Sequence, residues 1–429
     1  MKKFLFIMFF IPGFVFSQTQ QKCGNNQYVN KNKNLKKASQ KTINDIYEIV
    51  KTKKQSDTIL RIPVVVHVVY ENTQENINDS LILNQIEVLN KDYRRQNPDT
   101  INTRNVFDSI VTDTKIEFCL ATTDPFGQPT SGITRTQTTE TSFIDLSFNL
   151  DKVKSSATGG KDAWPVDKYL NIWVCDLSIN ILGTNAPFVL GFAYPPTGAP
   201  NWPPGSTPTN QMFDGVVVHY EVFGKNNPLS TLSFSGVTIT ANKGRVCVHE
   251  VGHYLGLRHI WGDGDCSQDD GISDTPQSDS QSDFQCDFTK NSCLDLPFDF
   301  PDMIENYMDY SSEDCQNSFT KDQKNIMRTI LETTRISLVS GSCSGGTTNT
   351  EEKNTSIKVY PNPSNGLINI KSDISIEEIE GFTVEGKTLF FYKPNTRSIN
   401  INCEKITKGV FFIKIKNKKE TILVKQIIK

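Results

Sequence analysis

The chain has 429 residues, of which 37% are hydrophobic and 22% charged, and its net charge is −3. This length exceeds what one ordinary hydrophobic core holds, so we expect two folded domains and processed ends. Beyond the first residues no stretch is long and apolar enough to cross a bilayer, so we expect the mature protein to have no transmembrane segment and to be soluble or attached to a surface by other means.

Residues 1–17 are predicted to be a secretory signal peptide. Two lysines precede an apolar run from Phe4 to Phe16, and the small residue Ser17 stands before the polar Gln18. An uncleaved membrane anchor is the alternative, but the run is shorter than the roughly 20 residues that a span requires. Export permits disulfides among the ten cysteines, although their pairing does not follow from their number.

Residues 18–60 are predicted to be a removable pro-segment. The stretch is polar and rich in lysine: residues 18–57 carry a net charge of +6, whereas residues 58–343 carry −16. A basic leader before an acidic body favours docking of the one on the other. Charge alone leaves open the alternative of two independently solvated surfaces.

Residues 61–343 are predicted to form one domain in which strands and helices alternate. Apolar runs predict strands at 62–70, 116–121, 169–177, 189–196 and 214–224, and helical spacing predicts helices at 81–97 and 241–257. A loop-dominated stretch is expected from Trp261 to Ser318. We interpret His67 and His219, each flanked by valines on a predicted strand, as core histidines.

The segment VHEVGHYLGLRH, residues 248–259, carries the strongest chemical signal in the chain. His249 and His253 are four residues apart and share one helix face, so two imidazoles can grip one metal ion. Gly256 can end the helix in a left-handed conformation, which turns the chain and brings His259 back as a third ligand. Three nitrogens leave the fourth tetrahedral position of a zinc ion open for water.

Glu250 stands next to the first ligand, where its carboxylate can act as general base on that water. Zinc lowers the pKa of bound water to about 7, so this set of residues suits peptide hydrolysis. A structural zinc site is the alternative, but such sites usually recruit cysteine. A surface adhesin that keeps a zinc-stabilised fold without turnover is a second alternative, and only hydrolysis needs Glu250.

The signature HExxHxxGxxH resembles that of the metzincin clan of metallopeptidases. The resemblance implies an α/β (α+β) catalytic domain with a mixed twisted sheet and an active-site helix. It also implies a Met-turn in NYMDYS, with Met308 beneath the metal, and it gives Tyr310 the role of stabilising the oxyanion of the tetrahedral intermediate. Plain core packing is the alternative for Met308, and a buried structural role is the alternative for Tyr310.

Within that clan the chain resembles the pappalysin family, in its cytophagalysin-like branch. The matching stretches are IPVVVHVVY, KYLNIWVCDL, LGFAYPP, GRVCVHEVGHYLGLRHIWGD, SDTPQ, PDMIENYMDY and FTKDQKNIMR, over roughly residues 60–335. The resemblance implies a zinc metalloendopeptidase in which LGFAYPP forms the antiparallel edge strand that pairs with an extended peptide substrate. It also implies the disulfides Cys266–Cys293 and Cys286–Cys315. The pairing of Cys119, Cys175, Cys247, Cys343 and Cys403 stays open.

The same resemblance bears on specificity and latency. Glu313 occupies the position whose acid selects Arg or Lys in the S1′ pocket; in relatives that acid is the shorter Asp, and a solvated loop acid is the alternative. Cys23, followed by Gly24, resembles a cysteine switch, in which a thiolate occupies the open zinc position. A disulfide is the competing use of Cys23. If Arg is preferred after the cut, the bond Leu60–Arg61 is a candidate site of autolytic activation.

The loop GDGDCSQDDGISDTP, residues 262–276, carries five aspartates. Calcium takes carboxylate and carbonyl oxygens from such loops, and the family resemblance agrees. We expect Asp270, Asp274 and Thr275 to be calcium ligands. An acidic loop without an ion is the alternative, since regular EF-hand spacing is absent.

Residues 344–354 read as a flexible linker, and residues 355–429 as a small all-β sandwich. VYPNPSNG and GVFFIKIKNKKETILVKQIIK resemble the type IX secretion sorting domain of Bacteroidetes. The resemblance implies passage through the periplasm to the outer surface or the medium, with the type IX secretion machinery and protein or peptide substrates as partners and no nucleic acid. An accessory domain that binds carbohydrate or protein is the alternative.

Overall fold

The computed structural model divides the chain into two compact units, Met1–Gly345 and Gly346–Lys429. It describes residues 21–23, 57–144, 149–181, 184–187, 189–196, 207–208, 210–234, 237–295, 297–340, 357–361, 364–383, 387–403, 406, 409–418 and 421–428. The predicted signal peptide, most of the predicted pro-segment and the predicted linker lie outside these residues. Among the described residues no helix is both long and apolar enough to span a membrane.

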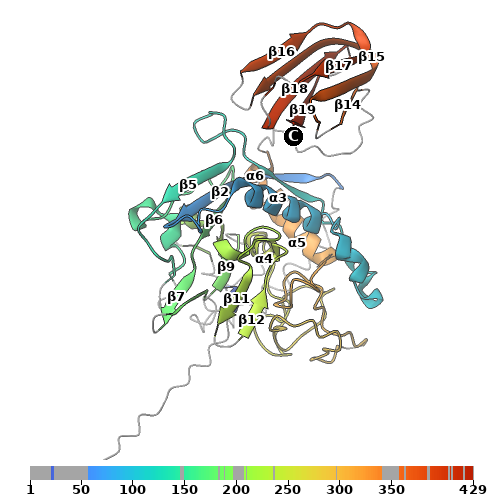
Figure 1. The fold of residues 1–429 in the computed structure, drawn as a ribbon. Coiled ribbons are helices and arrows are strands. Elements are labelled where there is room, and N and C mark those ends of the chain that lie inside the picture. Colours follow the sequence, from blue (N-terminus) through green and yellow to red (C-terminus); the bar gives the residue numbers. More distant parts are fainter. Residues whose placement is uncertain are drawn as a thin grey trace, which may run out of the picture. The chain divides into compact units, whose positions relative to one another are not determined.

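The first unit is built on a seven-stranded sheet in the order β1-β9-β10-β6-β2-β4, with β5 also paired to β2 (Figure 1). Its strands are β1 (Gln21–Cys23), β2 (Leu60–Tyr70), β4 (Ile116–Leu120), β5 (Ile133–Gln137), β6 (Leu170–Cys175), β9 (Val189–Ala193) and β10 (Val216–His219). Every pairing is parallel except that of β9 with β10. The predicted mixed sheet is therefore confirmed.

The strands read as continuous apolar runs because both faces of the sheet are buried. In β6, Ile172 and Val174 belong to the larger core on the helix side, while Trp173 and Cys175 belong to a second core on the opposite face. The predicted strand at 214–224 is shorter than expected, because the chain leaves the sheet after His219 in a 3-10 turn, Tyr220–Val222.

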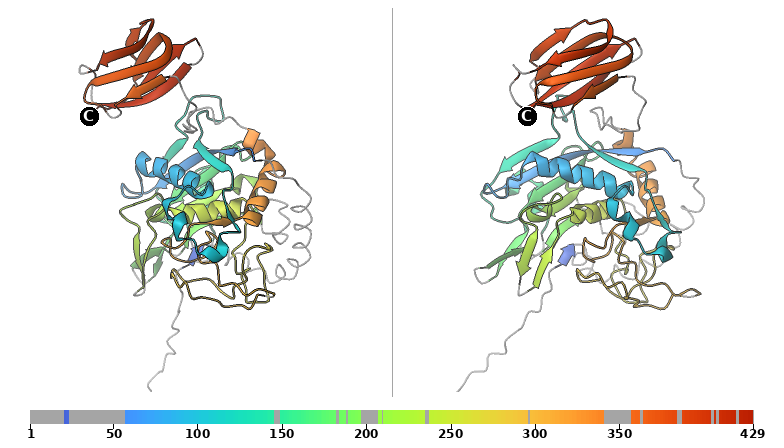
Figure 2. Two further views of the ribbon diagram at one scale, coloured as in Figure 1. Left: turned by 90° about the vertical axis from the view of Figure 1, so that its right-hand side faces the viewer. Right: turned by 45° about the vertical axis from the view of Figure 1, so that its right-hand side comes forward.

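Two helices cover the face of the larger core, as Figures 1 and 2 show: α3 (Asp79–Tyr93) contacts β4, and α4 (Arg245–Tyr254) contacts β9 and β10. Both lie within about four residues of the predicted ends. The chain then continues after the long loop with α5 (Lys321–Glu332) and α6 (Ile336–Ser340). Thr320 and Gln323 form a capping box that starts α5.

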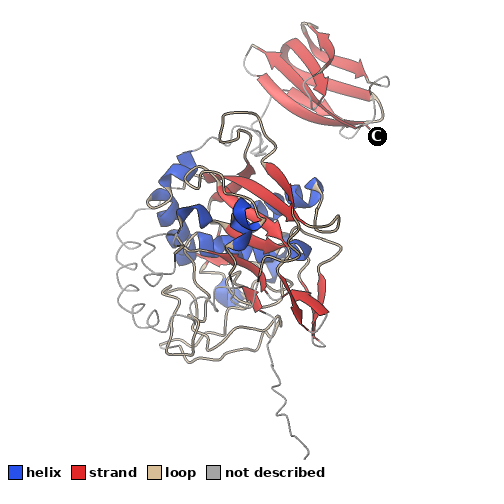
Figure 3. Ribbon diagram, turned by 90° about the vertical axis from the view of Figure 1, so that its left-hand side faces the viewer, coloured by secondary structure: helices blue, strands red, loops and turns tan. Residues whose placement is uncertain are grey.

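Three two-stranded sheets and a long loop complete the unit. The pairs are β3 (Val111–Thr112) with β13 (Phe319–Thr320), β7 (Ser178–Ile181) with β8 (Thr184–Pro187), and β11 (Thr231–Phe234) with β12 (Val237–Thr240). The stretch 261–318 contains no helix or strand in its described residues, as predicted, apart from the isolated bridge between Asn306 and Ser318; Figure 3 draws loops of this kind in tan. Two disulfides brace it, Cys266–Cys293 and Cys286–Cys315, which are the pairs that the resemblance implied.

The second unit is all β, as predicted. Its strands are β14 (Ile357–Tyr360), β15 (Leu367–Thr383), β16 (Thr388–Tyr392), β17 (Thr396–Asn402), β18 (Gly409–Asn417) and β19 (Thr421–Ile428). The long β15 pairs with β14 and β17 in its first part and with β16 and β18 in its second. Isoleucines that alternate along β15, such as Ile368 and Ile370, build the core of this unit.

Candidate metal centre

Helix α4 and the turn after it bring three histidines to one point. His249 and His253 lie on the same face of α4, which ends at Tyr254. Gly256 then adopts φ +97°, a left-handed conformation that glycine tolerates, and the chain returns with His259. The Nε2 atom of His253 lies 3.1 Å from the Nε2 atoms of both His249 and His259.

The outer ring nitrogens fix the tautomer of each histidine. Nδ1 of His249 lies 2.7 Å from the carbonyl oxygen of Tyr307, and Nδ1 of His253 lies 2.8 Å from that of Leu257. In His259 the partner of Nδ1 is a carboxylate oxygen of residue 263, at 2.6 Å. These oxygens accept hydrogen bonds, so each Nδ1 carries the proton and each Nε2 turns its lone pair inward.

Three inward lone pairs repel one another unless a cation lies between them. Burial lowers the pKa of His249 and His253 well below the ordinary range of histidine, so neither ring supplies that cation by taking a second proton. Neutral imidazole nitrogens at this spacing are the donor set that zinc prefers. The residues therefore fit a zinc ion.

Glu250 lies in α4 beside the first ligand and is completely buried. Its Oε2 accepts a hydrogen bond from Sγ of Cys23 at 3.3 Å, whereas Oε1 receives none from the residues that the structure describes. Burial raises the pKa of this carboxyl well above its ordinary value, while Cys23 and Lys22 oppose the change. An under-bonded carboxylate in a dry site is suited to accept a proton.

Glycine at position 191 of β9 makes the approach of Glu250 to the sheet possible. A Cβ at Gly191 would lie 2.6 Å from Cγ of Glu250, closer than real Cβ contacts. In α4, a Cβ at Gly252 would likewise lie 2.4 Å from Sδ of Met308. Met308 is therefore packed directly against the turn of α4 that separates the first two ligands, where the Met-turn was predicted.

Tyr310 and Cys23 complete the centre. The ring of Tyr310 lies 5.0 Å from that of His259, and its hydroxyl donates to the carbonyl oxygen of Cys23 at 3.1 Å. The ligand atoms of Cys23 and the three histidines all lie within 4.8 Å of one another. In the described part of the chain, no other group of His, Cys, Asp or Glu forms such a cluster.

Cys23 reaches the centre because β1 occupies the outer edge of β9. The two strands pair in parallel, with Gln21 opposite Val189 and Cys23 opposite Gly191. The segment that carries the predicted switch thus lies on the strand that was expected to pair with a substrate.

Lys22 is a residue that the sequence analysis missed. Its side chain is buried, and Nζ donates to the carbonyl oxygens of Asp309 and Ser311 at 3.4 and 3.5 Å. Burial lowers its pKa to about 8, although the carboxylates of Glu313, Asp309 and Glu250 act in the opposite direction. Its place directly before Cys23 and the charge contrast between leader and body are the signals that could have singled it out.

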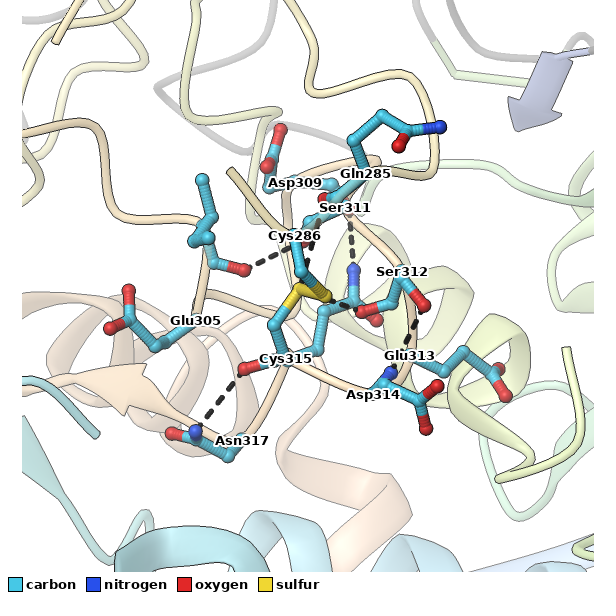
Figure 4. Close-up of a disulfide and its surroundings, with 12 residues drawn as sticks. Gln285, Cys286, Glu305, Asp309, Ser311, Ser312, Glu313, Asp314, Cys315 and Asn317 are labelled. Carbon is cyan, nitrogen blue, oxygen red and sulfur yellow. Dashed lines mark hydrogen bonds between the residues drawn. A yellow bond between two sulfur atoms is a disulfide. The ribbon is translucent and has the colours of Figure 1, made fainter. Parts of the chain in front are cut away.

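Lys22 lines a pocket of about 140 Å³. Its other lining residues come from β12 and Ala241, from Val246 of α4, and from residues 283–285 and 311–314. Figure 4 shows how the disulfide Cys286–Cys315 ties two of these segments together, with the amide of Ser312 donating to the carbonyl of Gln285. The disulfide therefore braces one wall of the pocket.

Glu313 lines this pocket, but its carboxylate is engaged elsewhere. Oε1 accepts from the backbone N–H groups of Arg245 and Val246 at 2.7 and 3.0 Å, and Oε2 accepts from that of Lys243 at 2.5 Å. These donors lie at the start of α4, where Gly244 has no side chain to cap the helix. Glu313 is thus the cap of the helix that carries the histidines.

The predicted calcium ligands lie close together without forming a cluster. The hydroxyl of Thr275 donates to both oxygens of Asp270 at 3.0 Å, while Oδ2 of Asp274 accepts from the amide of Asp322 at the start of α5. Burial raises the pKa of Asp270 well above its ordinary value and that of Asp274 to about 6. Calcium binding here stays a prediction.

The predicted activation site lies within a strand. Leu60 and Arg61 begin β2, where they pair with Ile116 and Glu117 of β4, and Nε of Arg61 donates to Glu117 at 3.0 Å. The two predicted core histidines are both fully buried, and His67 bonds Thr134 and Asn171.

Two family models match the chain. The model described as pregnancy-associated plasma protein-A matches residues 215–332, which include the three histidines and Met308. The model of the secretion system C-terminal sorting domain matches residues 358–429.

The chain is also similar to extracellular metalloproteases of fungi. It is 37% identical over 146 residues to one from Aspergillus oryzae, an alignment that covers 33% of this chain and 41% of that protein. It is 32% identical over 168 residues to one from Arthroderma benhamiae, covering 39% and 55%. The chain spans about half or less of the length of these relatives.

Two solved structures from Tannerella forsythia resemble the chain. A mutant of promirolysin has a TM-score of 0.60 and 37% identity, covering 75% of this chain and 97% of that one. Mature mirolysin in complex with a cleaved peptide has a TM-score of 0.55 and 41% identity, covering 66% and 96%. The alignment thus covers nearly the whole of each solved chain. The sequence identity is also well above the level at which a likeness shows the fold alone.

Proposed function

The chain belongs to the pappalysin family of zinc metallopeptidases, and on that premise we propose that it is a secreted endopeptidase made as a latent precursor. The observation that carries the proposal is the convergence of three neutral Nε2 atoms beside the under-bonded carboxylate of Glu250. A zinc-stabilised fold without turnover needs the histidines alone.

His249, His253 and His259 hold the metal, and zinc, when bound, polarises the scissile carbonyl and lowers the pKa of a water molecule. Glu250 takes the proton from the attacking water and then delivers it to the leaving amine. The hydroxyl of Tyr310, which now donates to a carbonyl oxygen of the pro-segment, donates to the oxyanion in the transition state.

The substrate lies along β9, where it adds a strand to the edge of the sheet. That edge is occupied by β1 in the precursor, so a substrate can bind only after β1 has left. An extended substrate peptide has free N–H and C=O groups, so it can take the place of β1 and form hydrogen bonds with the backbone of β9.

The pocket beside the metal selects a basic side chain after the cut. Lys22 supports this specificity, because it already places an ammonium group among the carbonyl oxygens of residues 309 and 311. The buried charge of Glu313 adds attraction for Lys or Arg, although both of its oxygens are committed to backbone donors.

Latency arises from two adjacent residues of the pro-segment. The sulfur of Cys23 lies among the three histidines, where it would bind the metal as a thiolate at the position that water must occupy, and the side chain of Lys22 lines the pocket that a basic substrate residue must enter. The C-terminal sorting domain sends the protein to the cell surface or the medium, where removal of the pro-segment opens the site.

The test uses the activated protein and its Glu250→Ala variant with a peptide library, with cleavage sites mapped by mass spectrometry and zinc measured in both proteins. We expect one zinc ion in each, cleavage before Lys or Arg by the wild type, and a rate lower by roughly 100- to 10,000-fold in the variant. A wild type without zinc, or a variant as active as the wild type, would show that the chain is not such an enzyme.

A further inference from the structure

The three histidines differ in the group that accepts the hydrogen bond from Nδ1. His249 and His253 donate through Nδ1 to backbone carbonyl oxygens, whereas His259 donates to a side chain, the Oδ1 atom of Asp263, at 2.6 Å. A carbonyl oxygen orients a ring. A carboxylate also places a full negative charge against it.

Asp263 is itself firmly placed. Its side chain is only 5% exposed, and its Oδ2 lies 3.8 Å from Nη2 of Arg258, whose guanidinium also donates to the carbonyl oxygen of Gly262 at 2.8 Å. The indole of Trp261 stacks on the face of the His259 ring, with the ring centroids 4.3 Å apart and the ring planes at 7°. The ring of the third ligand therefore has little freedom to turn.

The backbone of Asp263 points to the same role. Its φ of +59° lies in the left-handed region, which costs a residue other than glycine about 1 kcal/mol, although Asp and Asn tolerate it better than most residues. In this conformation the carboxylate, four residues after His259, folds back onto Nδ1 of that residue.

We propose that Asp263 is a positioning residue for the metal centre: its carboxylate fixes the orientation and tautomer of His259 and strengthens that imidazole as a zinc ligand. The inference rests on the proposed zinc site and adds a residue to it. A negative charge on Nδ1–H pushes electron density toward Nε2, so the metal is bound more tightly.

The test compares Asp263→Asn and Asp263→Gly in the full chain with Glu250→Ala, which prevents self-cleavage. Asn and Gly both accept positive φ, so the turn keeps its shape while the charge is lost. The zinc dissociation constant is measured by competition with a chelator, and the unfolding temperature is measured on the metal-free protein. Asp265→Asn, an exposed acid of the same loop, is the matched control.

We expect zinc affinity to fall by about 10- to 100-fold, less in Asn than in Gly, with the unfolding temperature of the metal-free protein unchanged and the control like the parent. Unchanged affinity in both variants would overturn the proposal, and so would a loss of affinity matched by a lower unfolding temperature of the metal-free protein. A parent that binds no zinc would overturn the proposed function itself, and this inference with it.

Discussion

The metal side of the site and the pocket beside it are assembled from the chain in opposite ways. All three histidines and Glu250 come from eleven consecutive residues, 249–259, on one helix and the turn after it. The pocket combines one residue of α4, Val246, with β12 and Ala241, residues 283–285, residues 311–314 and Lys22, which lies 287 residues before Asp309. Local helix geometry thus sets the metal centre, and tertiary contacts set the pocket.

The buried carboxylates of Glu250 and Glu313 also differ, in the number of hydrogen bonds that they accept. Glu250 keeps one oxygen without a donor among the described residues, while the oxygens of Glu313 together accept from three backbone N–H groups. An unsatisfied buried acceptor is costly, and a catalytic role is one reason for a protein to retain it. The contrast agrees with the proposed role of Glu250 as general base, whereas Glu313 accepts hydrogen bonds at the start of α4.

The substitution Cys23→Ala separates the two sides most strongly. Loss of the thiol opens the metal position while Lys22 still donates to the carbonyl oxygens of Asp309 and Ser311, so we expect the precursor to become active far sooner than the wild type. The measurement is the time course of peptide cleavage by purified precursor. Latency as long as that of the wild type would remove Cys23 from the mechanism.

Gly191→Ala tests whether the metal side needs the neighbouring strand. The new Cβ would lie 2.6 Å from Cγ of Glu250, so the base must move, and a displacement of this size lowers kcat/KM by about 100-fold. The zinc content stays at the wild-type level because the histidines are untouched. An active enzyme with normal kcat/KM would show that the position of Glu250 is not set by β9.

The sequence predicted what depends on local spacing. The convergence of the three histidines follows from positions i and i+4 on a helix and from Gly256, and the strands follow from apolar runs. Lys22 and the helix cap by Glu313 escaped prediction because their partners lie 287 and 68 residues away, and no pattern within a strand or helix encodes such a pairing. Asp263 escaped because its role depends on a positive φ that spacing does not reveal.

Lys22→Met tests how much the contacts of Lys22 in the pocket contribute to latency. The methionine fills a similar volume but loses the bonds to the two carbonyl oxygens, which are worth about 1.5 kcal/mol, or about tenfold in docking of the pro-segment. The precursor should activate about tenfold faster than the wild type, yet more slowly than Cys23→Ala. Lys22→Arg, which keeps the charge, is the control and should stay latent. If Lys22→Met and Lys22→Arg both activate as slowly as the wild type, the pocket has no part in latency.

Glu313→Gln carries the smallest expected effect and asks whether this residue acts by support or by selection. The amide keeps one acceptor but turns a donor toward a backbone N–H at the start of α4, so the free energy of unfolding in urea should fall by about 1 to 3 kcal/mol. Asp314→Asn is the matched control, since that side chain is 78% exposed and should cost less than about 0.5 kcal/mol. If Glu313→Gln instead keeps its stability and loses the preference for Lys and Arg, the carboxylate acts mainly on the substrate. The division between a local metal centre and a supported pocket would then have to be redrawn, with a charge in the pocket deciding what the metal centre cuts.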